Sequence, residues 1–147
     1  MSLIFNRRRF LLGAGVAALA LHGCATLEPE DSDRWRDAQR EALRSRAQAR
    51  WDALIKGDIA TVYGFTSPEY RAVVSEQQFR GKYGSVVDWR LAEVKNISYD
   101  SPTVATVSVE VTYRTWLRGM PDKPVETKSL IPEKWIYNNR EWWYTVN

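Results

Sequence analysis

Strict alternation of apolar and polar residues from Val104 to Trp116 is the feature that most constrains how this chain can fold. A period of two over such a length is typical of a β-strand with one buried face. That strand needs neighbours on its edges and a covering layer on its apolar face. The apolar positions are Ala105, Val107, Val109, Val111 and Tyr113.

Strand patterns flank this segment on both sides. We expect a preceding strand over Trp89–Tyr99 and a following one over Val125–Tyr137, bent at Pro132 because proline cannot donate to a central ladder. Asn138–Arg140 has the composition of a tight hairpin turn, since asparagine tolerates positive φ. Glu141–Val146 then pairs back as the final strand.

Helical signals fill the part of the domain before residue 85. Apolar residues recur at intervals of three and four from Trp35 to Ile55, and Gly57 ends that helix. Asp58 opens a second short helix, and Ser67-Pro68 is a strong helix start. Ser75 stands three residues before Gln78, the spacing of a capping box.

Helices followed by an antiparallel meander place the domain in the α+β class. The segment Trp51–Asp58 and the ending Glu133–Tyr144 resemble the nuclear transport factor 2-like superfamily, which includes ketosteroid isomerase and scytalone dehydratase. The resemblance covers residues 33–147. It implies a cone-shaped, cystatin/nuclear transport factor 2-like fold with N-terminal helices packed in a curved antiparallel sheet. It leaves activity open, because this fold hosts enzymes, binders and assembly modules.

The first 23 residues have the layout of an export signal. Arg7-Arg8-Arg9 precedes an apolar run, Phe10–Leu21, which is too short to span a bilayer. Asn6–Leu12 is similar to a twin-arginine signal. Asn6 and Leu12 depart from that pattern, so the general secretory route stays open.

Cys24 follows Leu21-His22-Gly23, which resembles a bacterial lipobox. The resemblance implies that Cys24 is acylated and becomes the first residue of the mature protein, with residues 24–32 as lipidated cysteine and tether. A lipid of this kind gives stable membrane anchoring. The alternative is that the ordinary signal peptidase cleaves the signal, for example after Ala18-Leu19-Ala20, and that Cys24 is an incidental residue. In lipoproteins of this kind, an aspartate directly after the cysteine is associated with retention in the inner membrane. By resemblance, Ala25 at this position favours the outer membrane, with the domain facing the periplasm of the cell envelope.

Composition removes several function classes. The chain has 21 basic and 18 acidic side chains, and three of the basic ones are Arg7–Arg9, so the mature part is close to neutral and gives no reason to expect nucleic acid. Its single histidine, His22, lies in the signal. We therefore expect no metal site, no cofactor and no histidine-based catalysis.

Arginines recur on the predicted first helix, away from its apolar stripe. Their pattern predicts a solvated helix face, and the alternative is contact with anionic lipid headgroups. These residues are Arg36, Arg40, Arg44 and Arg50.

Carboxylates and tyrosines remain as the possible catalytic groups, as in the isomerase branch of the resembled family. Each is better explained as a surface charge or a core tyrosine, so we assign no catalytic residue. The carboxylates are Asp88, Glu93 and Glu110, and the tyrosines are Tyr63, Tyr99 and Tyr113. For an aromatic-lined pocket, the ligand-binding candidates are Tyr63, Trp89 and Tyr113.

Trp142 and Trp143 are adjacent in the final strand, so their side chains point to opposite faces. One of them is therefore expected to face solvent or to be covered by something else, and an oligomer or a partner is a reasonable cover. We expect an envelope-anchored lipoprotein with a non-catalytic binding or accessory domain, for a protein partner or a small apolar ligand. The alternatives are an isomerase- or dehydratase-type enzyme and a structural homodimer module.

The lipobox makes a prediction about covalent structure. Mass spectrometry of the protein purified from membranes is expected to find Cys24 as the N-terminal residue, with fatty acyl chains on it. An unmodified Cys24 thiol, or an N-terminus at another residue, would contradict the envelope assignment.

Overall fold

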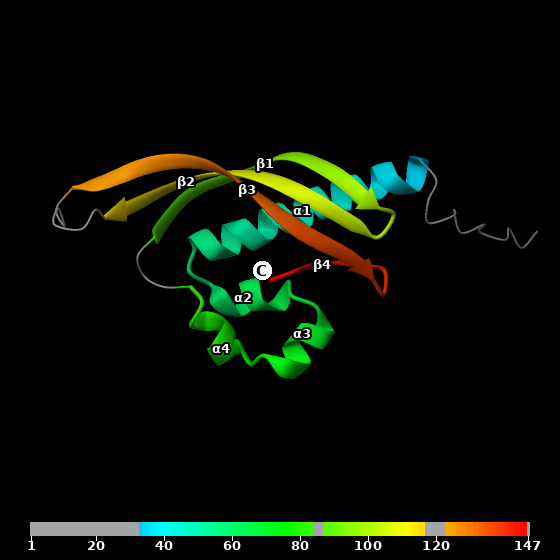
Figure 1. The fold of residues 1–147 in the computed structure, drawn as a ribbon, viewed down its shortest axis with the longest axis horizontal. Coiled ribbons are helices and arrows are strands. Elements are labelled where there is room, and N and C mark those ends of the chain that lie inside the picture. Colours follow the sequence, from blue (N-terminus) through cyan, green and yellow to red (C-terminus); the bar gives the residue numbers. More distant parts are fainter. Residues whose placement is uncertain (1–32, 84–86, 117–122, 147) are drawn as a thin grey trace, which may run out of the picture.

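The computed structural model describes residues 33–83, 87–116 and 123–146 (Figure 1). Cys24 and the segments predicted as signal, lipobox and tether lie outside them. The helices are α1 (Asp33–Ile55), α2 (Ile59–Gly64), α3 (Pro68–Val73) and α4 (Glu76–Arg80). The strands are β1 (Val87–Ser101), β2 (Val104–Trp116), β3 (Pro124–Asn138) and β4 (Glu141–Tyr144).

The strands form one antiparallel sheet in the order β1-β2-β3-β4. The alternation in β2 is confirmed, because Val107, Val109 and Val111 are fully buried between strands and helix. β3 stays in register with β2 through Pro132, which lies opposite Ser108. β4 pairs only with the end of β3, so the missing N–H of Pro132 costs no ladder bond on that side.

The predicted helix ends are confirmed. Gly57 takes φ +72°, a conformation that favours glycine, and ends α1. The Asp58 side chain accepts the N–H of Thr61, which caps α2. Ser67 caps α3 in the same way, and the capping box at the start of α4 is complete.

The predicted cone was wrong. α1 runs along β1, and the other helices gather beyond β4, as Figure 1 shows. α1 packs along β1, α2 packs on α1 and α4 packs on α2, so the short helices are not packed into a curved sheet. The described residues form a four-stranded antiparallel sheet with one long helix beside it and a group of short helices outside it.

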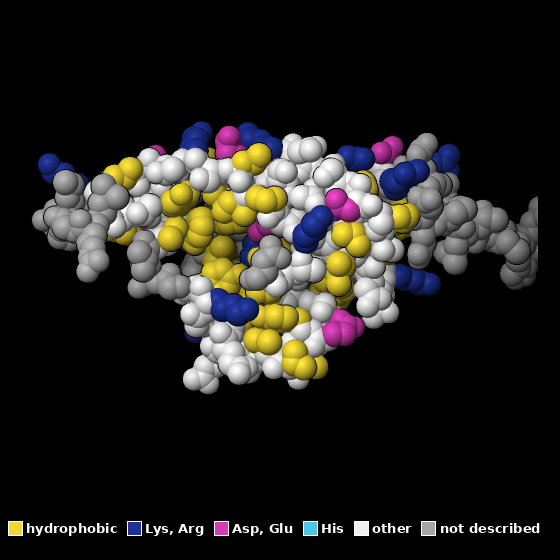
Figure 2. Space-filling model, viewed as in Figure 1, with side chains coloured by type: hydrophobic (Ala, Val, Ile, Leu, Met, Phe, Trp, Pro, Cys, Tyr) yellow, Lys and Arg dark blue, Asp and Glu magenta, His cyan; other side chains and the backbone are white. Residues whose placement is uncertain are grey.

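The core lies between α1, the sheet and the short helices. Its largest fully buried side chains are Trp135, Trp142 and Phe79. Figure 2 shows hydrophobic side chains gathered between the sheet and the helical group. Large rings bury much area each, which suits a domain of this size.

Both tryptophans of β4 are covered by the chain itself. Trp142 is 2% exposed and packs on Tyr99 and Tyr137, while Trp143 is 7% exposed and lies under the guanidinium groups of Arg46 and Arg71. The expectation that one of them faces solvent was wrong, and the cover over Trp143 comes from arginines of the chain itself. α1 contributes Gln39 against Trp142 and Arg46 against Trp143, and α3 contributes Arg71 against Trp143.

The β3–β4 turn makes a prediction about stability. Asn139 and Arg140 have φ of 52° and 65°, as a type I′ turn requires, but a side chain such as that of Arg140 is strained there. Arg140→Gly is expected to raise the free energy of unfolding by about 0.5–1 kcal/mol in urea denaturation. Asn139→Gly is the matched control and should gain less, because asparagine tolerates positive φ. A loss of stability in Arg140→Gly would contradict this interpretation.

Candidate functional site

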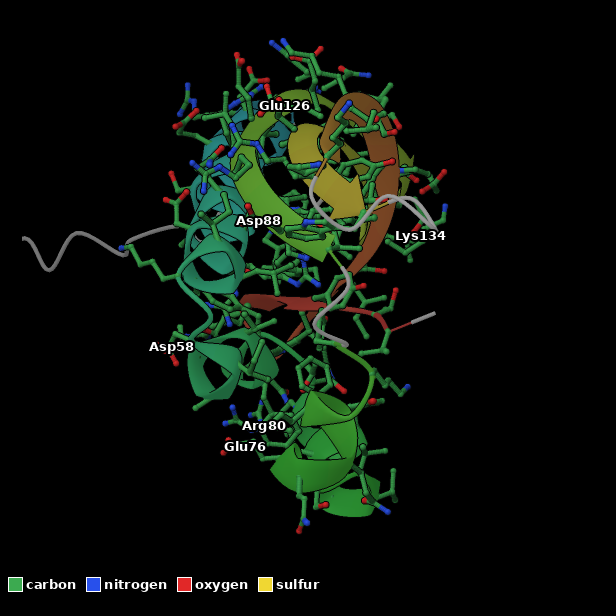
Figure 3. The ribbon with its side chains drawn as sticks, turned by 90° about the vertical axis from the view of Figure 1, so that its left-hand side faces the viewer. Asp58, Glu76, Arg80, Asp88, Glu126 and Lys134 are labelled. Carbon is green, nitrogen blue, oxygen red and sulfur yellow. The ribbon has the colours of Figure 1, made fainter. Side chains whose placement is uncertain are left out.

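The carboxylates considered for catalysis are exposed on the sheet and lie in ion pairs. Glu93 and Glu110 are directly opposite each other on β1 and β2, and the ammonium group of Lys95 lies 2.6 Å and 3.7 Å from their carboxylate oxygens. Asp88 lies 3.6 Å from Arg90 and away from the short helices (Figure 3). Surface ion pairs account for all three carboxylates.

The tyrosines do not converge on these carboxylates. The Tyr63 hydroxyl donates to the carbonyl of Val74 at 2.5 Å, and the Tyr99 hydroxyl donates to the carbonyl of Arg36 at 3.1 Å. Both hydroxyls therefore serve the backbone of neighbouring elements. Burial raises the pKa of Tyr99, so its hydroxyl remains a donor.

The structure brings together two of the three aromatic ligand candidates. Trp89 packs between Trp51 and Tyr113, with ring centroids 5.2 Å and 5.5 Å away. Tyr63 lies elsewhere, against Phe79. Trp89 and Tyr113 pack directly against each other, and this contact is a core arrangement of rings.

The prediction that the arginine face of α1 is simply solvated was wrong. The guanidinium of Arg40 donates to the carbonyl of Ile97 at 3.0 Å, and that of Arg44 donates to the carbonyl of Val94 at 2.8 Å. The amide of Gln48 exchanges two further hydrogen bonds with the β1 backbone. These side chains occupy the free edge of β1, which would otherwise expose unpaired backbone groups.

Arg50 lies inside the protein, with 2% of its surface exposed. Its guanidinium is 2.6 Å from Glu133 Oε1, donates to the Tyr83 hydroxyl at 3.1 Å, and lies 3.7 Å from the centroid of the Tyr144 ring. The indole N–H of Trp135 donates to Glu133 Oε2 at 3.3 Å. We call these five residues the Arg50 cluster. They tie α1, β3 and β4 together with the segment after α4.

Burial controls the electrostatics of this cluster. Burial raises the pKa of Glu133, and the Arg50 guanidinium beside it opposes that shift without cancelling it. Burial also raises the pKa of Tyr144 to about 12. Both oxygens of Glu133 already hold a partner, and so does the Tyr83 hydroxyl. The cluster is best suited to holding the fold together.

A groove of about 400 Å³ lies between α1, the residue after α2, and the β3–β4 hairpin. We call it the hairpin groove. Its surface is mostly apolar, and the exposed residues Arg140 and Glu141 form its polar rim. It is lined by Gln39, Ala42, Ser45, Arg46, Ala49, Phe65, Arg140, Glu141 and Trp142.

Two arginines of the hairpin groove differ in what they bind. Arg46 is occupied: it lies 2.9 Å from Glu141 and donates to the carbonyl of Trp142 at 2.6 Å. Arg140 is exposed and has no hydrogen bond or ion pair to any residue within the described ranges. Our sequence analysis missed this groove. The available signals were the small residues at helical spacing on α1 and an arginine in a turn that favours glycine.

The described residues contain neither a metal-type cluster nor a membrane-spanning helix. In 33–83, 87–116 and 123–146, no three His, Cys, Asp or Glu side chains are grouped so that they could hold a metal ion. Within the same ranges, no helix has the length and apolar character needed to cross a bilayer.

No family model and no curated protein matches this chain. Among solved structures, it is similar to a SEC-C motif containing protein from Rhodopseudomonas palustris, with a TM-score of 0.52 and 16% sequence identity. The match covers 69% of this chain and 73% of that one. Identity at this level relates the folds alone. The assignment to the nuclear transport factor 2-like superfamily was therefore wrong, on both this comparison and the arrangement of the helices.

The Arg50 cluster makes a prediction about stability. Arg50→Met is expected to lower the free energy of unfolding by about 3–5 kcal/mol, because it leaves the Glu133 carboxyl buried without its cation. The double variant Arg50→Met, Glu133→Leu should recover much of that loss, since no charge is then buried alone. Urea denaturation of both variants tests this. A double variant less stable than Arg50→Met would mean that the pair is not the reason for the loss.

Proposed function

We propose that this chain is a lipid-anchored protein of the cell envelope whose domain binds an anionic amphiphile in the hairpin groove. The observation that supports it most is the free guanidinium of Arg140 at the rim of a mostly apolar groove. An apolar chain suits the groove, and a carboxylate or phosphate group suits the arginine.

The size and lining of the groove support a ligand of this class. About 400 Å³ falls within the range of small-molecule sites in proteins. Ala42, Ala49, Phe65 and Trp142 supply apolar contact, and the small side chains on α1 let a ligand approach the helix.

The charges at the rim support an anionic head group. Arg46 and Glu141 neutralise each other at 2.9 Å, so Arg140 provides the excess positive charge. An arginine can bind a carboxylate or phosphate through two parallel hydrogen bonds.

The proposed anchor supplies a reason for this ligand class. A lipid on Cys24 would hold the domain close to a membrane surface, where amphiphiles are abundant. The groove begins at Gln39, about 9 Å along α1 from Asp33, so it would lie on the part of the domain near the tether.

Calorimetric titration with decanoate and its uncharged counterpart decanol tests the proposal. Arg140→Ala is expected to weaken decanoate binding about tenfold, because one charge-assisted interaction is lost, and to leave decanol binding unchanged. Ala42→Trp should abolish binding of both, since it fills the groove.

Ala38→Trp is the matched control, because Ala38 is also exposed on α1 but does not line the groove. The proposal fails if Ala42→Trp and Ala38→Trp bind decanoate equally well. It also fails if Arg140→Ala binds decanoate as tightly as the unaltered protein.

A further inference from the structure

The first part of β3 has a strand neighbour on only one side. β3 pairs with β2 from Pro124 to Ile136, but β4 pairs only with Trp135–Asn138. Within the described residues, the edge of β3 before Lys134 is therefore open. Glu126, labelled in Figure 3, lies within this stretch, and Lys134, also labelled, follows its end.

The chain itself covers parts of the edges of β1 and β4. Side chains of α1 bond to the free edge of β1, as described above. On β4, Arg46 donates to the carbonyl of Trp142, and the N–H of Tyr144 donates to the carbonyl of Phe65. Along the first part of β3, the described residues make no such contact with the edge, and open edges favour pairing with another strand.

The direction of the backbone groups on β3 follows from the bonds at its end. The N–H of Tyr137 donates to the carbonyl of Thr103 beside β2, while the carbonyl of Lys134 accepts from Thr145 on the opposite side. Because these directions alternate along a strand, even-numbered residues present their N–H and C=O to the open edge. Those residues are Glu126, Lys128 and Leu130, and Pro132 ends the row.

We propose that two copies of this chain pair antiparallel through this edge. In the register we propose, Glu126 lies opposite Lys128 of the partner subunit, and by symmetry Lys128 lies opposite the partner's Glu126. Thr127 then lies on the two-fold axis, opposite the partner's Thr127. Only pairs of even-numbered residues can exchange backbone hydrogen bonds here, and this register provides them.

Charge complementarity selects a second copy as the occupant. The edge presents one carboxylate and one ammonium group two residues apart, so an antiparallel copy places opposite charges face to face. Their present ion pairs, Glu126 with Arg114 and Lys128 with Glu110, leave both side chains at least half exposed. Leu130, which is 62% exposed, would lie against the partner's Pro124.

Disulfide trapping in the full chain tests the register. Thr127→Cys places two thiols on the axis, where the Cα atoms of a non-hydrogen-bonded pair are about 4.5 Å apart, within the reach of a disulfide. Ser129→Cys is the matched control on the same face, with its two Cα atoms about 14 Å apart in this register. We expect the Thr127→Cys dimer to form about ten times faster. Both variants retain Cys24. The chain without an added cysteine is therefore run beside them, and it measures any cross-linking through Cys24.

Two further changes to Thr127→Cys test the pairing itself. Lys128→Pro removes an N–H that faces the open edge and no bond to β2, so cross-linking should fall about tenfold. Lys128→Glu should also slow it by placing two carboxylates opposite each other, and adding Glu126→Lys should restore it, since the charges are then exchanged.

Three results would overturn the proposal. One is equal or faster cross-linking at residue 129 than at residue 127. Another is a Lys128→Pro protein that remains folded by circular dichroism and cross-links at the original rate. The third is failure of Glu126→Lys to restore the rate lost in Lys128→Glu.

Discussion

The buried ion pair between Arg50 and Glu133 is the constraint on which the rest of the structure depends. It joins the long helix to the third strand over 83 positions of sequence, and both side chains are 3% exposed. Removing two charges from water is costly, and close geometry with further hydrogen bonds offsets that cost only in one arrangement of α1 against the sheet. In that arrangement, Arg40, Arg44 and Gln48 meet the backbone of β1.

Strand edges explain why α1 has so polar a surface. A helix lying over a sheet needs only one apolar stripe, but α1 also lies along an edge strand with free carbonyl groups. Its arginines are long enough to reach those carbonyls and keep part of the guanidinium in water. The same requirement applies to β4, where Arg46 binds the backbone and covers the ring of Trp143.

Local structure was largely predictable from sequence, and the partners of long side chains were not. Capping at Asp58, Ser67 and Ser75, and the turn at Asn139, depend on residues within three positions, so their signals are complete in the sequence. The role of Arg50 depends on a residue in β3 and on the tyrosines around it. Nothing in the helical period distinguishes the buried Arg50 from Arg44. The placement of the helices was predicted from the resemblance of the final hairpin to another superfamily, and that placement was wrong.

The β3–β4 hairpin connects the stability of the fold with the proposed function. In β4, Trp142 is buried in the core and Trp143 packs beneath two arginines. These contacts on both faces of the strand fix the position of the turn that precedes it. A turn held this firmly can keep Arg140 at a positive φ that glycine would adopt more easily. Arg140 has no hydrogen bond or ion pair within the described residues that would stabilise the fold. Its conformational cost is understandable if the guanidinium is needed at the rim of the hairpin groove, because residues that bind ligands often reduce stability where they act.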